Sequence, residues 1–510
     1  MRRRTLLQLG AAALFAPAPV LAQEGDAVTL GIPRDIQGAL DPTTRLSSIE
    51  ANLLKVVCPG LIRFKPNSFA WEPALAKSIE PQGDTVIAFE LAPGHQFTDG
   101  FGEVTADDVK FSFERFRKPG PDGKLPSYAD DWQTLDSVEV TGKYTGRIKL
   151  KAPAPMLWTT VLPDASGCII SAKALDAGAY RTDKQPVRMI GAGPYVFAGW
   201  TPNERVSLQA NAQWPGPRPA FREITLRPIR DSKTAELALR ANELQFTAID
   251  PRNADAVGKA AGTHVLKHDS INMVWIGINV DKKPFDDPRV RQAIAAAIDV
   301  DQVIEGAWNG TVSRADGPLA PGLVGHWADA PKRKRDVAAA KQLLQQAGAS
   351  GLTARLTLLN KPEYQAAGVI VQALAAEAGI KIALDVQDGG SFWSAGNGDA
   401  GKNLELSLQR FGGKADPAFN MQWFTASQIG VWNWQRWNDP DFDKLVSQAA
   451  ATDDRDARQT MYVDAQRRMS DSYAYIWLTH EVYAYGYRNG LTPSIEPNGD
   501  DWVLSEFSRA

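Results

Sequence analysis

Residues 408–443 carry the side chains of this chain that are best suited to chemistry, and that chemistry is recognition of a small molecule. Arg410 could offer two parallel hydrogen bonds from its planar guanidinium to a carboxylate or a phosphate. It could equally form an ion pair within the fold. Phe411 beside it supplies an apolar ring. We therefore take Arg410 and Phe411 as candidate ligand-binding residues.

A second aromatic group follows in the same segment. Aromatic rings give a ligand contact area, and amide groups replace the water that its polar atoms lose. Alternation along a strand would place Trp432 and Trp434 on one face, without Trp437. We expect one or two of these rings to stack on a solute and the others to pack in the interior. The candidates are Trp432, Asn433, Trp434 and Trp437, with Trp393 and Trp423 as weaker ones.

Residue patterns for catalysis or metal binding are missing from the sequence. The five histidines form no His-Glu-x-x-His motif, the cysteines are not spaced as metal ligands, and there is no nucleophile elbow. Three adjacent acid pairs, Asp107-Asp108, Asp286-Asp287 and Asp453-Asp454, fall at expected helix starts or loops, where capping explains them. We therefore expect a binding protein that is not an enzyme and that holds no cofactor and no metal ion.

Strands and helices alternate along the chain, and their pattern predicts an α/β fold. Residues 28–32 and 85–91 resemble strands, and Asp287 followed by Pro288 is a typical helix start. Residues 353–358, 364–378 and 380–386 read as strand, helix and strand. That order predicts a parallel pair of strands joined by a right-handed crossover.

Two sequence blocks resemble a known family. One spans residues 71–109 and the other residues 279–308, which include Pro284-Phe285-Asp286-Asp287-Pro288. Both are similar to the family 5 extracellular solute-binding proteins, the capture subunits of peptide, opine and nickel importers. The resemblance implies an α/β fold of the periplasmic-binding-protein type, class II, cluster C, with two lobes and an additional inserted domain.

The resemblance also implies a division of the chain. We expect a signal peptide at 1–22, a discontinuous domain I, a domain II inserted between the first two pieces of domain I, and a closing domain III. The expected ranges are 23–55, 188–268 and 482–510 for domain I, 56–187 for domain II and 269–481 for domain III.

By resemblance, the two lobes would close over a small peptide-like or opine-like solute and deliver it to a membrane permease with its ATPase subunits. The protein itself is expected to be a monomer that meets the membrane only through the permease. Two alternatives stay open: a secreted hydrolase on the same scaffold, and a sensor or chaperone-like binder without a transport role.

One motif departs from the family pattern. Peptide-binding relatives carry a Trp, then an Asp that pairs with the amino terminus of the ligand, then an Asp-Pro. Here the Asp-Pro is Asp416-Pro417, but the Trp position falls at Arg410 or Phe411 and the amine-binding Asp is replaced by Gly413. This departure puts ordinary recognition of a free α-amine in doubt.

The first residues predict export to the periplasm. Arg2-Arg3-Arg4 precede an uncharged segment, and small residues stand before Gln23, as signal peptidase requires. The route is either the general secretory one or the twin-arginine one, because residues 3–8 resemble a twin-arginine signal. Without these three arginines the chain has 53 basic and 59 acidic residues, a balance that argues against nucleic acid as a partner. In this compartment Cys58 and Cys168 could be bridged or could both be free thiols.

Overall fold

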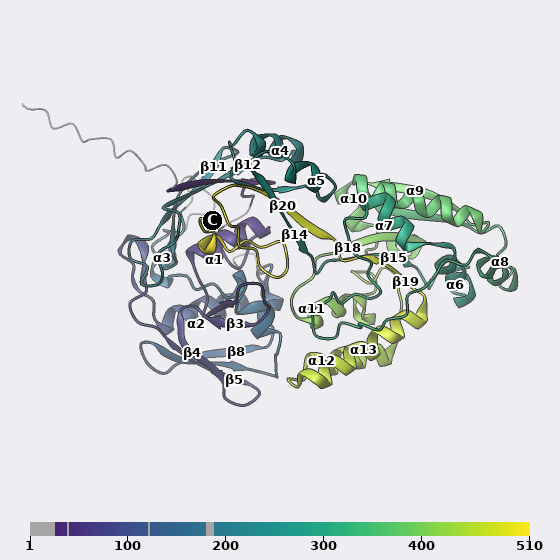
Figure 1. The fold of residues 1–510 in the computed structure, drawn as a ribbon. Coiled ribbons are helices and arrows are strands. Elements are labelled where there is room, and N and C mark those ends of the chain that lie inside the picture. Colours follow the sequence, from purple (N-terminus) through teal and green to yellow (C-terminus); the bar gives the residue numbers. More distant parts are fainter. Residues whose placement is uncertain (1–25, 38–39, 121–122, 180–187) are drawn as a thin grey trace, which may run out of the picture.

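The structure, a computed structural model, describes residues 26–37, 40–120, 123–179 and 188–510 (Figure 1). The predicted signal peptide 1–22 and residues 180–187 of the predicted domain II lie outside the described residues. Figure 1 shows two lobes, and the predicted mixed α/β architecture is confirmed in both.

A seven-stranded sheet organises the first lobe, with strand order β10-β11-β12-β1-β13-β20-β14. The N-terminal strand β1 lies parallel to β12 and β13, and the remaining pairs are antiparallel. Strands from both ends of the chain therefore share one sheet. Its strands are β1 (Ala27–Ile32), β10 (Tyr195–Thr201), β11 (Arg205–Ala210), β12 (Glu223–Pro228), β13 (Phe246–Ile249), β14 (Thr263–Asp269) and β20 (Val482–Arg488), and its helices are α1 (Ser48–Val57), α4 (Ser232–Arg240) and α5 (Ala254–Gly258).

A smaller antiparallel sheet, with order β4-β5-β9-β8, lies below it in the same lobe (Figure 1). Helix α2 begins with a capping box, as the acidic pair predicts. The Thr105 side chain accepts a hydrogen bond from the backbone N–H of Asp108, and the Asp108 side chain accepts one from the backbone N–H of Thr105. The elements are β4 (Ala76–Pro81), β5 (Val86–Leu91), β8 (Leu135–Val140), β9 (Thr145–Leu150), α2 (Ala106–Glu114) and α3 (Ala172–Asp176), with the short pairs β2 (Ile62–Phe64) with β3 (Trp71–Pro73) and β6 (Gln96–Phe97) with β7 (Gly102–Glu103).

The second lobe is built on a five-stranded sheet with order β17-β16-β18-β15-β19. Strands β16 and β17 are parallel and α9 connects them, which confirms the predicted parallel pair and its helical connection. All six residues of β15 are buried, because helices cover both faces of the sheet centre. The strands are β15 (Met273–Ile278), β16 (Thr353–Leu359), β17 (Lys381–Gln387), β18 (Leu406–Phe411) and β19 (Tyr475–Thr479), and the helices are α6 (Pro288–Ala297), α7 (Val300–Trp308), α8 (Val337–Gln346), α9 (Pro362–Glu377), α10 (Gly389–Ser394), α11 (Pro417–Met421), α12 (Pro440–Ala450) and α13 (Arg455–Ser472).

Each of the three larger sheets takes its strands from one of the three predicted domain ranges, apart from Asp269 at the end of β14, while the domain limits themselves stay a prediction. Two segments connect the lobes, one between β14 and β15 and one between β19 and β20. They contact each other where the backbone N–H of Ser270 donates to the carbonyl of Glu481 over 3.3 Å. Because these two segments join the sheets of the two lobes in the described part of the chain, we call them the hinge segments.

The remaining local predictions can be placed directly. Asp287 caps α6 and Asp454 caps α13, each accepting a backbone hydrogen bond. Cys58 and Cys168 are both buried and unbridged. Within the described ranges, none of the helices has the length and apolar composition that crossing a membrane requires.

Candidate ligand site between the lobes

A cavity of about 340 Å³ opens where the two lobes face each other, and we call it the interlobe cavity. Its walls come from all three predicted domain ranges: the first domain at 34–51 and 483–501, the inserted domain at 64–164, and the third domain at 272–415. A molecule held here would touch both lobes at once.

Arg410 lies on the wall of this cavity, at the end of β18. Its Nε is 3.0 Å from Oε2 of Glu481, and its Nη2 donates to the hydroxyl of Tyr483 over 3.2 Å. Burial disfavours the charge of Arg410, but Glu481, Tyr483 and Tyr364 together outweigh burial, and the pKa of Arg410 lies above its ordinary value. The structure therefore confirms the ion pair of Arg410, and its role as a ligand contact stays a prediction.

Glu481 occupies the hinge between β19 and β20 and joins several elements. Its backbone has a left-handed φ of 65°, which is costly for a residue with a side chain. Its carboxylate accepts hydrogen bonds from Asn272 Nδ2 at 3.1 Å and from the Tyr364 hydroxyl at 3.0 Å, besides the one from Arg410. These contacts hold the strained residue in place and couple Arg410 to the hinge.

An aromatic pocket of about 330 Å³ adjoins the interlobe cavity, and the two share Arg410 and Gly412. The rings of Phe411 and Trp432 meet edge to face with centroids 5.7 Å apart. The structure thus brings Arg410, Phe411 and Trp432 together. The pocket is lined by Trp393, Arg410, Phe411, Gly412, Phe419, Trp423 and Trp432.

Three predicted site residues lie elsewhere. The side-chain amide of Asn433 is buried and donates to the carbonyls of Phe424 and Trp437 at 3.0 and 2.8 Å. Trp434 is only 1% exposed, and its Nε1 donates to the Val431 carbonyl over 3.1 Å. Trp437 packs on the ring of Phe442. Neither the interlobe cavity nor the aromatic pocket is lined by these three residues.

The backbone of residues 431–436 explains why Trp432 lines the aromatic pocket and Trp434 does not. The sequence pattern suggested strand alternation there, but the segment folds as turns, and Arg436 has a left-handed φ of 54°. Asn433 stabilises these turns with its amide, so Trp432 points to the pocket while Trp434 points inward to Phe392. The expectation that Trp432 and Trp434 share a strand face is therefore wrong.

Gly413 lies where the backbone comes close to the hinge segment. A Cβ at this position would lie 1.9 Å from the carbonyl oxygen of Ile271. An aspartate therefore cannot occupy it without a shift of the backbone. Asp416 lies three residues further along, and both of its carboxylate oxygens bond within the protein. Oδ1 accepts a hydrogen bond from Arg458 at 2.6 Å, and Oδ2 accepts one from Thr159 of the first lobe at 3.0 Å.

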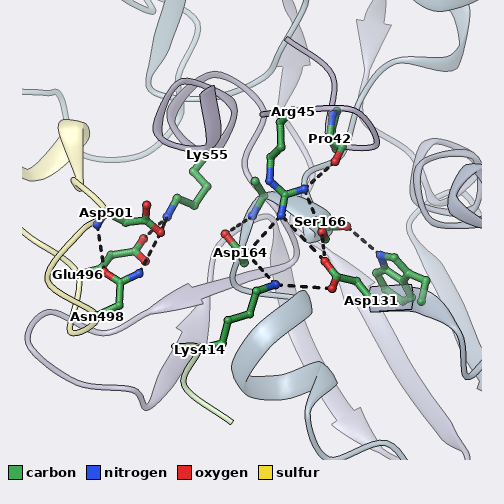
Figure 2. A network of polar contacts seen from close by, with 12 residues as sticks. Pro42, Arg45, Lys55, Asp131, Asp164, Ser166, Lys414, Glu496, Asn498 and Asp501 are labelled. Carbon is green, nitrogen blue, oxygen red and sulfur yellow. Dashed lines mark hydrogen bonds and ion pairs between the residues drawn. The ribbon is translucent and has the colours of Figure 1, made fainter. Parts of the chain in front are cut away.

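A network of charges crosses the cavity between the lobes (Figure 2). Lys414 of the second lobe reaches Asp131 at 3.6 Å and Asp164 at 3.8 Å in the first. Arg45 contacts the same Asp164 at 3.4 Å. Burial favours the neutral form of Asp164, but Arg45 and Lys414 prevail and its pKa is lowered. We call Asp131, Asp164 and Lys414 the interlobe bridge.

Beside this bridge, Lys55 is held by two acids of the C-terminal segment, Glu496 at 2.7 Å and Asp501 at 3.0 Å (Figure 2). Sequence reasoning missed these charged residues. They come from distant parts of the chain, and although Asp131 and Asp501 each follow another aspartate, only the fold reveals which charges meet.

Comparisons with known proteins agree with this architecture. The glutathione-binding protein GsiB of Pectobacterium atrosepticum is 29% identical over 492 residues, covering 94% of this chain and 93% of that protein. The di/tripeptide-binding protein 2 of Pseudomonas aeruginosa is 29% identical and covers 83% of this chain and 84% of its own. The periplasmic binding protein DppA of Helicobacter pylori, solved with the peptide STSA, superposes with a TM-score of 0.77 at 24% identity, covering 95% of this chain and 97% of its own.

The expected class of fold is thereby confirmed, because nearly the whole chain superposes on a solved periplasmic binding protein. The family profile of the bacterial extracellular solute-binding proteins, family 5, matches residues 70–450, which is most of the chain. The chain belongs to the bacterial extracellular solute-binding proteins of family 5.

Proposed function

We propose that this protein captures a small peptide-like or opine-like solute in the interlobe cavity and delivers it to an ABC permease with its ATPase subunits. The observation that carries the proposal is the position of Arg410, which faces both the interlobe cavity and the aromatic pocket. One solute can therefore place an anionic group on Arg410 and an apolar side chain among the rings. Relatives named for glutathione and for di- and tripeptides bind solutes of this kind.

The proposed mechanism is closure of the two lobes about the hinge. A solute shifts the equilibrium toward the closed form only by the extra free energy of its contacts there. Arg410 contributes from the second lobe, and residues such as Ser48 and Tyr128 contribute from the first. The permease would then recognise the closed form. We place this cycle in the periplasm, with the protein acting as a monomer.

A library measured by isothermal titration calorimetry tests the proposal. It should contain dipeptides, tripeptides, glutathione, opines and sugars, and at least one member with an anionic group should bind, releasing heat and raising the melting temperature with concentration. Small-angle scattering should show a smaller radius of gyration for the protein with that compound. Binding of no member, or chemical turnover of a bound one, would reject the proposal.

A further inference from the structure

The charges on the walls of the interlobe cavity do not all have partners. Four basic and four acidic side chains line it. Arg45 and Lys414 both form ion pairs with Asp164. Arg410 forms an ion pair with Glu481. Glu496 and Asp501 both form ion pairs with Lys55. Within the part of the chain that the structure describes, the two left without an ion pair are Arg34 and Asp500.

The backbone around Asp500 separates it from its acidic neighbour. Asn498 Oδ1 accepts hydrogen bonds from the backbone N–H groups of Asp500 and Asp501, both over 3.0 Å. Both acids line the cavity, but this turn places Asp501 in an ion pair with Lys55, whereas Asp500 has no ion pair among the described residues. Two consecutive acids of the same loop thus have different surroundings.

The surroundings of Asp500 make its negative charge costly. Burial and the charge of Asp501 raise its pKa to about 6, and Arg410, a hydrogen bond from Ser48 and Arg34 only partly offset them. Tyr483 also faces it. A desolvated carboxylate without an ion pair gains most from meeting a cation in the same cavity.

We propose that the solute is a zwitterion whose protonated amine binds Asp500 while its anionic group lies against Arg34 and Arg410. The proposal rests on the proposed function and names the solute class for that same cavity. An acid and a base that have no ion pair among the described residues are neutralised together by a molecule that carries one charge of each sign, with no net charge buried. The amine is thus recognised by the first lobe, from the loop at 496–501.

A matched pair of probes tests the amine contact: alanyl-phenylalanine and its N-acetyl form, measured by calorimetry at pH 7.5. The parent protein should bind the free amine about tenfold or more tightly than the acetylated form, as expected for a charge-assisted hydrogen bond. Asp500→Asn should lose this preference and bind the acetylated form as the parent does. Equal affinity of the parent for both probes, or an unchanged preference in Asp500→Asn, would overturn the inference.

If neither probe binds, the comparison moves to the compound that the library identifies and to its N-acylated form. A bound compound that carries no amine overturns this inference and leaves the proposed function intact. Absence of any bound compound rejects the proposed function itself.

An acid of the first lobe that lines neither the interlobe cavity nor the aromatic pocket supplies a control. Asp41→Asn removes an ion pair to Arg115 and should lower the melting temperature, yet it should keep the preference for the free amine. Asp500→Asn should melt no lower than the parent. In addition, the parent's affinity for the free amine should fall about tenfold per pH unit below pH 6, because protons then compete for Asp500. Neither the acetylated probe nor Asp500→Asn should show that fall, and a shared fall would contradict the assignment.

Discussion

At the scale of single residues, the guanidinium of Arg410 lines the interlobe cavity and also pairs with Glu481 of the hinge segment, so its removal should have two effects. Arg410→Ala should weaken binding of an anionic solute by about 1.5–3 kcal/mol, the range for hydrogen bonds to charged groups. It should also lower stability, because Glu481 loses its ion pair. Calorimetry and urea denaturation measure the two effects separately.

Glu481→Gln is the matched control, because it removes the same ion pair and keeps the guanidinium in the cavity. It should lower the denaturation midpoint while the anionic solute stays bound. An Arg410→Ala protein that binds the solute with the parent's affinity would exclude Arg410 from the site.

Two tryptophans that are two residues apart should behave differently. Trp434 is buried against Phe392, so Trp434→Ala should cost roughly 3–5 kcal/mol of unfolding free energy and leave affinity nearly unchanged in the folded fraction. Trp432 lines the aromatic pocket, so Trp432→Ala should weaken binding of solutes with an apolar side chain. Denaturation and calorimetry on both variants measure this contrast. Reduced affinity in Trp434→Ala alone would restore the stacking role that the sequence suggested.

At the scale of elements, the segment after β18 is shaped by the close approach of Gly413 to Ile271. Gly413→Ala would place a Cβ 1.9 Å from that carbonyl oxygen, so the loop must move, at a cost of about 1–3 kcal/mol. Gly412→Ala is the control, because its nearest neighbour, Asn272 Oδ1, is 3.9 Å away. Its urea midpoint should match the parent's. Equal midpoints for the two variants would show that the loop can shift without a cost in unfolding free energy.

At the scale of the whole molecule, the interlobe bridge should favour closure. Lys414→Met removes the contacts to Asp131 and Asp164 that span the lobes. We expect weaker solute binding and a larger radius of gyration by small-angle scattering. Lys402→Met is the control, because its ion pair with Asp399 lies within one lobe. A Lys414→Met protein with unchanged scattering would show that the bridge does not hold the closed form.

The hinge also makes stability depend on pH. Burial lowers the pKa of His480 to about 4, and its Nδ1–H donates to the Asn272 carbonyl over 2.7 Å. The unfolded chain binds this proton from about pH 6.5 downward and the folded one only near pH 4, so stability falls as pH decreases through that window. This loss is up to about 3 kcal/mol. Urea unfolding between pH 7 and 4 should be less pH-dependent for His480→Asn, and an identical slope would refute this assignment.

The helix caps and the crossover of this protein were predictable because their causes are local. Asp287 and Pro288 fix the start of α6 through groups one or two residues away. The β16-α9-β17 unit follows from periodicity within a single stretch of chain. Arg410 and Phe411 could be proposed as ligand contacts because they lie in a segment rich in aromatic and polar residues, where the resembling family carries a Trp.

What the sequence alone determined is the family, the α/β class, and the region that carries the aromatic pocket. Only the tertiary structure decided that Trp432 lines the pocket while Trp434 is buried, because the turns at 431–436 set their directions. It also decided which charges of the interlobe cavity lack an ion pair among the described residues. Arg34 and Asp500 come from distant segments, and pairing between such groups depends on distances that the chain acquires only when its lobes are folded together.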